Sequence, residues 1–396
     1  MRYTIGEMAE IIDGDRGKNY PQQHEFLDEG YCLFLNTGNV TKVGFSFDSN
    51  QFISKEKCDL LRKGKLQRHD IVYTTRGTVG NAAYYSDSIP YEHVRINSGM
   101  VIIRPKEAIV CTEFLYQILK SDYYRPFFRK HCTGSAQPQL PIKNFSTIEL
   151  DLPDLPVQCR IAGILSTYDD LIENNQKQIK LLEEAAQRLY KEWFVDLRFP
   201  GHETTPIVDG VPEGWKEQSL YQIADVVMGQ SPKSEYYNQV GEGLPFHQGV
   251  GSYGNRFVSD ETYSTSFTRI AEAGSILFSV RAPVGRLNLT KNKVVIGRGL
   301  AAINHRRGAQ SYLFYLLKEK FFRDDIIGNG SIFASISKEE LLNQTFLIPI
   351  DSLVEQFNGI AGGIDKKIDI LSGQIRLLTE ARNRLLSKLM SGELEV

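Results

Sequence analysis

The sequence predicts an α+β (mixed α/β) protein with two globular domains in a tandem, pseudo-twofold arrangement, separated by two long helices packed as an antiparallel coiled coil. The first observation is a twelve-residue stretch that occurs as QIKLLEEAAQRL at 178–189 and again as QIRLLTEARNRL at 374–385. Apolar residues around both copies follow a heptad spacing, the period of a helix packed along another helix. The segments that precede the two copies also resemble each other, so the whole half-chain is repeated.

The two long helices are predicted from the steps between apolar residues. From Ile161 to Trp193 these steps alternate between four and three residues, and an offset of 196 places a second such series near the end of the chain. Because each seam needs an apolar partner, we expect the helices to pack on each other. The seam residues chosen for this contact are Ile172, Ile179, Leu182, Leu189, Ile368, Ile375, Leu378 and Leu385. Four glycines between 359 and 373 lower helix propensity, so we expect the first two turns of the second helix to fray or bend.

Composition and pattern divide the chain into five segments. Residues 1–152 form a first globular domain, and residues 153–197 form the first long helix. Residues 198–214 are rich in Pro and Gly and have no period, which is typical of a linker. The pattern then restarts, with a second globular domain at 215–350 and the second long helix at 351–396.

Each globular domain is expected to mix strands and helices. In the first, a short amphipathic helix is predicted over 4–12 and a longer helix over 113–130. Runs of β-branched and aromatic residues between turn signals predict strands at 31–36, 70–75, 82–86, 98–105 and 146–153. The second domain repeats this order, since GSILFSVRAPVG at 274–285 corresponds to HDIVYTTRGTVG at 69–80. The loops differ strongly, as expected if the two domains have different specificities.

Composition excludes several classes of protein. No apolar run in the 396 residues approaches the ~18 residues of a membrane span, so no membrane partner is expected. The start lacks a secretory pattern and the five cysteines include no Cys-x-x-Cys pair, so we expect reduced thiols in a cytoplasmic protein. A net charge of −2 is low for a free-standing nucleic-acid binder. Phosphate contacts should therefore be few, local or shared with a partner.

No catalytic motif is found. The chain contains no Gly-x-x-x-x-Gly-Lys-Ser/Thr, no His-Glu-x-x-His and no metal-ligand spacing of Cys and His. We therefore expect no catalytic residue, no metal and no cofactor on this chain. It is interpreted as a reader or a scaffold.

Three glycine-flexed loop segments in each globular domain are the candidates for DNA contact. They carry Arg, Gln, Asn, His, Ser and Thr; among these, Arg, Gln and Asn suit bidentate contacts to base edges, and several donate hydrogen bonds to phosphate. The candidates are Thr37, Asn39, Thr74, Thr75, Arg76, Ser135, Gln137, His247, Gln248, Ser279, Arg281 and Ser331. Other interpretations stay open: an intradomain ion pair for the two arginines, a structural cap for the Gly-Ser turns, and a solvated loop for His247 and Gln248.

The helical stretches and their flanks also carry a resemblance to a known family. The first half contains LPDLPVQCRIAGILSTYDDLIENNQKQIKLLEEAAQRLYKEWFVDLRFP at 152–200, followed by DGVPEGW at 209–215. The second half contains IPIDSLVEQFNGIA at 348–361 and RNRLLSKLMSGELEV at 382–396. These stretches resemble the two conserved regions of the specificity subunit of type I restriction–modification systems, and the order of segments resembles that family over the whole chain.

The resemblance implies that each globular domain is a target-recognition domain that reads one half of a bipartite site in double-stranded DNA. It implies that the helices set the spacer between the half-sites and dock two methyltransferase subunits, which methylate adenine N6. Two restriction/motor subunits would complete the complex. S-adenosylmethionine, ATP and Mg are then expected only on the partner subunits. Two alternatives stay open: a coiled-coil scaffold that binds protein, and an enzyme that acts alone.

Overall fold

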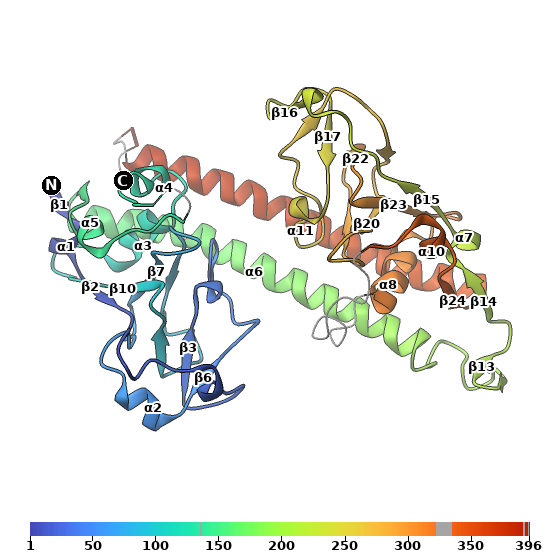
Figure 1. The fold of residues 1–396 in the computed structure, drawn as a ribbon, viewed down its shortest axis with the longest axis horizontal. Helices are drawn as coiled ribbons and strands as arrows, with labels where there is room; N and C mark the ends of the chain where they lie inside the picture. The colour runs from blue at the N-terminus through green and yellow to red at the C-terminus, as the bar shows by residue number, and fades with distance from the viewer. Residues whose placement is uncertain (135–136, 322–334, 391–392, 395) are drawn as a thin grey trace. The chain divides into compact units, whose positions relative to one another are not determined.

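The computed structural model describes residues 1–134, 137–321, 335–390, 393–394 and 396. The chain divides into two compact units, each with a globular domain and a section of both long helices (Figure 1). Unit 1 comprises Met1–Asn175 and Gly373–Val396, and unit 2 comprises Gln176–Ser372.

The globular domain of unit 1 combines short strands with short helices. Its strands are β1 (Arg2–Thr4), β2 (Ala9–Asp13), β3 (Cys32–Leu35), β4 (Val40–Thr41), β5 (Gly44–Phe45), β6 (Phe52–Ile53), β7 (Ile71–Thr74), β8 (Ala82–Tyr84), β9 (Val94–Ile96), β10 (Met100–Pro105) and β11 (Glu149–Asp151). Its helices are α1 (Ile5–Met8), α2 (Lys55–Leu60), α3 (Thr112–Lys120), α4 (Arg125–Arg129) and α5 (Ile142–Ser146), with 3-10 turns at Gln23–Glu25 and Thr37–Asn39.

A four-stranded antiparallel sheet in the order β2-β10-β7-β8 forms the centre of this domain. One face of the sheet, with Tyr73 and Ile103, packs with the helices. The other face, with Val72 and Ile102, packs with Leu33 of a three-stranded sheet in the order β6-β3-β9. Because both faces are covered, β7 and the first four residues of β10 are buried, and all of them except Thr74 are apolar.

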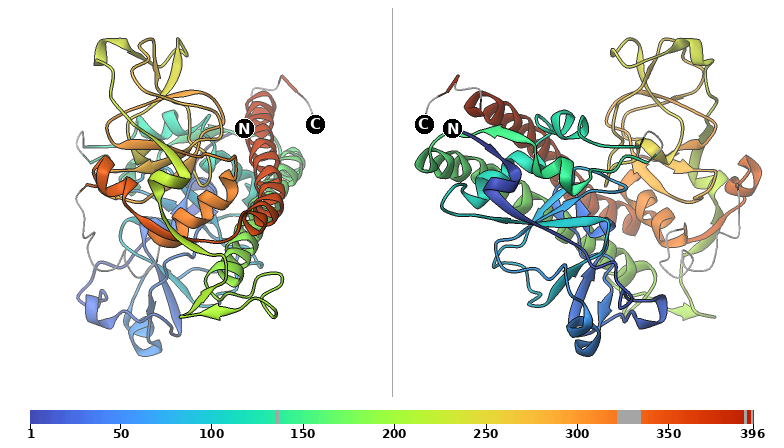
Figure 2. Two further views of the ribbon diagram at one scale, coloured as in Figure 1. Left: turned by 90° about the vertical axis from the view of Figure 1, so that its right-hand side faces the viewer. Right: turned by 60° about the vertical axis from the view of Figure 1, so that its left-hand side comes forward.

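Helix α3 connects this sheet to the first long helix, α6 (Leu155–Phe194). Phe114, Leu115 and Ile118 of α3 share one buried cluster with Tyr73 of β7 and Ile161 of α6. Figure 2 shows α3 beside α6 in the unit 1 part of the molecule. The domain is therefore held to the helix by a continuous apolar core, and burial of that area is its main stabilising term.

Unit 2 repeats this architecture. Its strands are β12 (Ile207–Val208), β13 (Val211–Pro212), β14 (Lys216–Ser219), β15 (Ala224–Met228), β16 (Tyr237–Asn238), β17 (Leu244–His247), β18 (Tyr263–Ser264), β19 (Ile270–Ala271), β20 (Ile276–Ser279), β21 (Leu287–Leu289), β22 (Val294–Ile296), β23 (Leu300–His305) and β24 (Thr345–Ile348). Its helices are α7 (Leu220–Ile223), α8 (Gln310–Phe321) and α10 (Lys338–Leu342), with 3-10 turns at Ser234–Tyr236 and Val250–Ser252.

The central sheets of the two units match strand for strand, while the second sheet has three strands in unit 1 and five in unit 2. The order β15-β23-β20-β21 reproduces β2-β10-β7-β8, and the pair β14-β24 reproduces β1-β11. The parallel pair β17-β22 likewise reproduces β3-β9. The predicted tandem repeat of the α+β domains is therefore confirmed at the level of strand pairing.

The helices α6 and α11 (Asp351–Met390) are both 40 residues long and run antiparallel (Figure 1). In unit 1, Asn175 Nδ2 donates to Gln374 Oε1 at 3.3 Å, and Leu389 shares a buried cluster with Ile161. In unit 2, the rings of Tyr190 and Phe357 lie 5.6 Å apart between centroids. All eight seam residues chosen from the sequence are buried or half-buried, so the predicted antiparallel coiled coil is confirmed.

The helix predicted over 4–12 is wrong in its second half. It ends after one turn as α1, and the chain continues as β2, where Ile11 and Ile12 pair with β10. The same change occurs from α7 to β15 in unit 2. β-branched residues pack well on a pleated surface, and this sheet contact outweighs the helical spacing. The helix predicted over 113–130 is likewise divided into α3 and α4, with a proline in the first turn of α4.

The expected fraying at the start of the second long helix is also wrong. Helix α11 is continuous from Asp351 through all four glycines. Phe357 and Ala361 are fully buried on either side of Gly359, so tertiary packing compensates for the low helix propensity of glycine. In the segment expected to be an irregular linker, β12 and β13 pair as a short hairpin.

Candidate nucleic-acid interface

The three candidate loops of unit 1 meet at Gly99. The backbone N–H groups of Thr75 and Arg76 both donate to Gly99 O, at 2.9 and 3.1 Å. Thr37 lies against the same glycine, since a Cβ atom built at Gly99 would lie 2.7 Å from the Thr37 methyl group. The third loop joins through Gln139, which forms β-bridges with both Arg76 and Thr133. Loops far apart in sequence are thus brought to one place.

Unit 2 builds the same junction around Gly299. Val280 N donates to Gly299 O at 2.9 Å, and Arg281 forms a β-bridge with Ser335. A Cβ atom at Gly299 would lie only 2.6 Å from the carbonyl oxygen of Gln248. Glycine is therefore required at Gly299, where the obstacle is backbone, while a side chain at position 99 would have to displace the Thr37 methyl group.

Thr74 and Ser279 shape the loop that carries the arginine in each unit. Thr74 Oγ1 donates to Thr78 O at 2.5 Å, and Ser279 Oγ donates to Pro283 O at 2.6 Å. Both side chains are buried. Thr75 is also buried, and its hydroxyl donates to Gly99 O at 3.2 Å. These three residues thus hold the turn in place. Direct DNA contact by them remains a prediction, and their burial argues against it.

Asn39 and His247 also have structural roles in this molecule. The Asn39 amide is 3% exposed and donates to Ser46 O and Ser49 O at 3.1 and 2.8 Å. His247 is 1% exposed, with Nδ1 2.9 Å from Ser252 Oγ and Nε2 3.1 Å from Asp260 Oδ1. The solvated loop weighed as one interpretation of His247 is therefore not found, because both ring nitrogens are used to fix the loop after β17, and DNA contact by His247 stays a prediction.

Four candidates present polar side chains at the surface. Gln137, Gln248 and Arg281 are exposed, and Arg76 is half-exposed. Neither arginine side chain makes an ion pair or a hydrogen bond within the described part of the chain, so the intradomain ion pair weighed for them is not found there. Gln248 Oε1 accepts from Ser231 Oγ at 2.8 Å. Ser135 and Ser331 lie outside the described residues.

Several basic residues near these loops were missed from the sequence. A cavity of about 600 Å³ adjoins the unit 1 junction and is lined by Lys42, Arg125 and Arg129 together with Gly77 and Gly134. Arg125 and Arg129 lie one turn apart on α4, but Lys42 is 83 residues before Arg125, so no sequence motif shows all three together. In unit 2, Arg298 is an exposed basic residue beside the Gly299 junction. Its backbone N–H donates to Ser231 Oγ at 3.2 Å. Its position beside Gly299 was the only available signal.

Lys42, Arg129 and Arg298 are exposed, whereas Arg125 pairs with Asp122 at 3.1 Å and its side chain is only 13% exposed. Cations and exposed amides at a loop junction suit phosphate oxygens and base edges. Within the described residues, no group of three or more His, Cys, Asp and Glu side chains is placed to hold a metal ion. No helix in the described part of the chain is long and apolar enough to cross a membrane.

Comparison with known proteins identifies the family. The profile of the type I restriction modification DNA specificity domain matches residues 1–184 and 212–377. The chain belongs to this family. The two matched segments correspond to the two halves of the internal repeat, so each half matches separately. The chain is therefore a DNA specificity subunit of a type I restriction–modification system, and a coiled-coil scaffold without DNA specificity is not favoured.

Relatives cover nearly the whole chain. A protein of Methanocaldococcus jannaschii assigned as the MjaX type I restriction enzyme specificity subunit is 28% identical over 386 residues, covering 90% of this chain and 89% of its own. The HindI specificity subunit of Haemophilus influenzae is 21% identical and covers 98% of this chain and 100% of its own. The crystal structure of the type I specificity subunit from M. genitalium has a TM-score of 0.56 at 15% identity, covering 98% and 95% of the two chains. That structure supports the fold.

Proposed function

We propose that each globular domain reads one half of a bipartite site in double-stranded DNA. The observation that carries this proposal is the duplicated junction, in which Gly99 and Gly299 each contact two candidate loops of their own domain. Two copies of one junction with different side chains suit two different half-sites. Arg76 and Gln137 are the proposed base-reading side chains of the first domain, and Arg281 and Gln248 are those of the second. The exposed Lys42 and Arg129 are proposed to bind backbone phosphate.

We propose that the chain itself is non-catalytic and acts with partner subunits. Two methyltransferase subunits would supply S-adenosylmethionine and methylate adenine N6, with the target base flipped into their own pocket. Two restriction/motor subunits would bring ATP and Mg. A cytoplasmic location, where the chromosome is accessible, follows from this proposal.

Exposed apolar residues on the long helices support two docking positions. Ile164 and Leu377 are exposed in unit 1, and their repeat equivalents Ile360 and Leu181 are exposed in unit 2. The equivalent residues are identical although none of them is in the core. Large apolar side chains that are exposed in the free chain and repeated at equivalent positions suit two copies of one protein partner.

A selection from a random duplex library tests the DNA proposal. The complex of this chain with its methyltransferase partner is expected to enrich two fixed sequences at a fixed separation. Absence of enrichment in that complex contradicts the proposal and favours a protein-binding role. Methyl transfer by the purified single chain would instead show that it is an enzyme acting alone.

Arg76→Ala is expected to weaken reading of the first half-site only. Loss of one bidentate arginine contact costs about 1–3 kcal/mol, which is about 5- to 150-fold in affinity. Arg281→Ala is the matched variant for the second half-site. The measurement is the base preference at each half-site in the same library selection. Equal loss at both half-sites from either variant is the contradicting result, since that outcome indicates a folding defect.

Leu181→Glu and Leu377→Glu are each expected to remove one of the two methyltransferase copies, because a buried unpaired carboxylate is strongly unfavourable at an apolar contact. The double variant is expected to bind none. The mass of the assembled complex, measured in solution, gives the count. Leu347→Glu is the control, since Leu347 is exposed on β24 and has Asp151 as its repeat equivalent. Two copies bound by the double variant would place the docking surface elsewhere.

A further inference from the structure

Each unit contains an ion pair between its globular domain and a long helix, and the acidic partners are repeat equivalents. They are Asp169 of α6 in unit 1 and Asp365 of α11 in unit 2, related by the offset of 196. Both lie in the first half of their 40-residue helix.

In unit 1, Asp169 is held by three donors. Lys120 Nζ and Gln117 Nε2 of α3 both lie 2.5 Å from Asp169 Oδ2, and Arg382 Nη1 of α11 lies 2.6 Å from Oδ1. The carboxylate thus connects the globular domain to both helices at once. Burial lowers the pKa of Lys120 to about 8. Burial acts to raise the pKa of Asp169, but the Lys120 charge and these hydrogen bonds bring it below its ordinary 3.8.

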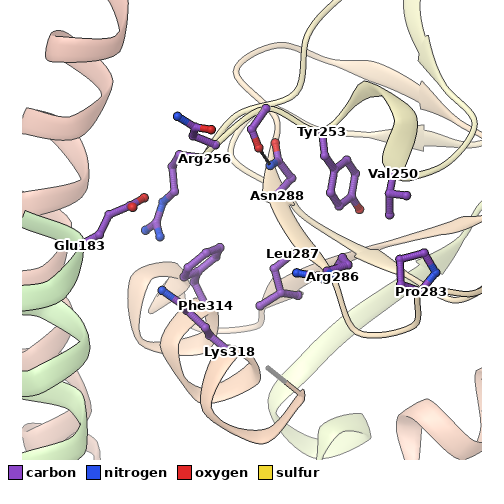
Figure 3. Close-up of a pocket in the computed structure, with 12 residues that line it drawn as sticks. Glu183, Val250, Tyr253, Arg256, Pro283, Arg286, Leu287, Asn288, Phe314 and Lys318 are labelled. Carbon is purple, nitrogen blue, oxygen red and sulfur yellow. Dashed lines mark hydrogen bonds between the residues drawn. The ribbon is translucent and has the colours of Figure 1, made fainter. Parts of the chain in front are cut away.

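In unit 2, the partner of Asp365 comes from a different element. Arg256, on the loop between the 3-10 turn Val250–Ser252 and β18, pairs with Asp365 through Nη2. Its guanidinium carbon lies 3.7 Å from the centroid of the Phe314 ring on α8, and the residue is 3% exposed. Figure 3 shows this side chain between Glu183 and Phe314, at one side of a cavity of about 360 Å³. Burial raises the pKa of Glu183.

In both units the acceptor is the repeat-equivalent aspartate, whereas the donor residues differ. Lys318, the repeat equivalent of Lys120, lines the cavity in unit 2, and Ala186 is the equivalent of Arg382. A buried ion pair adds little stability over apolar packing, but it does fix geometry because its hydrogen bonds are directional. The same contact made twice from different donors points to a shared need for a fixed orientation.

We propose that Asp169 and Asp365 are positioning residues that fix the orientation of each recognition domain on its helices, and thereby the spacer lengths that the complex accepts. This inference rests on the proposed function. It assigns the two aspartates no contact with DNA. Half-site sequence would be read by the loops, while the number of base pairs between half-sites would depend on how rigidly each domain is held.

The test removes the unit 2 ion pair without leaving a lone buried charge. The double variant Arg256→Met/Asp365→Asn replaces both groups by neutral side chains of similar length, a change that buried pairs tolerate well. The control is Lys291→Met/Asp369→Asn, because Lys291 Nζ and Asp369 Oδ1 join the same domain to the same helix at 2.6 Å but are exposed. Both are assembled with the methyltransferase partner and selected on duplexes whose half-sites are separated by varied spacers.

The double variant is expected to keep both half-site sequences and to lose spacer selectivity. The ratio of affinities between the preferred spacer and spacers one base pair longer or shorter should fall about tenfold, and the control should keep the wild-type ratio. An unchanged ratio in the double variant overturns the proposal. Asp365→Glu, which keeps the charge on a longer arm, is the second variant, and it must also change the ratio if the double variant does not fold. If the wild-type complex selects no sequence at all, the proposed function fails instead.

Discussion

Asp169→Ala is expected to lower the free energy of unfolding of unit 1 by about 3–5 kcal/mol, the range measured when one partner of a buried ion pair is removed. The variant leaves Lys120 and Arg382 without the carboxylate that both contact at 2.5 and 2.6 Å. Lys120 is 8% exposed at its side chain, so water does not replace the lost partner. Lys120→Met is expected to cost less, because Asp169 keeps its contacts with Gln117 and Arg382.

Hydrogen exchange of the α3 amides is the appropriate measurement, because it reports on unit 1 separately from unit 2. Glu149→Ala is the control, since Glu149 pairs with Arg2 on the surface of the same unit and should cost below about 1 kcal/mol. The pKa of Asp169 is lower in the folded state, so its contribution is present above pH 3.8 and is lost as the pH falls further. The difference between wild type and Asp169→Ala should therefore shrink in acid. A difference below 1 kcal/mol at neutral pH would show that the ion pair does not support the unit.

The parts of the fold that could be predicted are those with a long period. The heptad spacing covers most of α6 and α11, and one apolar seam leaves few other ways to bury it. The duplication then supplied the architecture of the second unit from that of the first. Short elements were less predictable, as Ile11 and Ile12 show. Over only a few residues the sequence allows either a helical turn or a strand, and pairing with other strands determines which one forms.

The candidate interface was predicted at the level of loops and only partly at the level of residues. Arg76, Arg281, Gln137 and Gln248 present their side chains at the surface. Asn39 is a similar polar residue on a similar loop, yet its side chain points inward to bind backbone carbonyl groups. Sequence composition shows which hydrogen-bond donors a loop carries but not where their side chains point. The orientation of a side chain depends on the conformation of the turn and on the residues packed under it.

The ion pairs of Asp169 and Asp365 could not be found from the sequence for a related reason. The repeat does align the two aspartates, but Arg256 is 109 residues from Asp365 along the chain. Arg256 also lies in a loop with no counterpart among the matched stretches. The donor lies on a different element in each copy and therefore leaves no repeated pattern in the sequence. Only the folded arrangement shows that both aspartates pair with the globular domain of their own unit.

Insertion of one heptad into both long helices is expected to change the DNA site that the complex recognises. The insertions belong between Asn175 and Gln176 in α6 and between Ser372 and Gly373 in α11, where one unit ends and the other begins. Seven residues add about 10 Å of helix, which corresponds to about three base pairs at about 3.4 Å each. We expect both half-site sequences to stay the same and the spacer to lengthen by about three base pairs, with affinity for the original site reduced more than a hundredfold, roughly 3 kcal/mol.

Both helices must be lengthened because they pair antiparallel. An insertion into α6 alone shifts one side of the seam past Asn175 and Gln374, whose side chains are hydrogen-bonded across it, and it should mainly destabilise the chain. A seven-residue insertion between Asp209 and Gly210, in the hairpin turn between β12 and β13, is the control and should leave the spacer unchanged. A heptad keeps the apolar seam on the same face to within about 20°, so the recognition domains stay attached as before. Altered half-site sequences in the double insertion would mean that the helices influence base reading itself, and an unaltered spacer would mean that another part of the complex sets the separation.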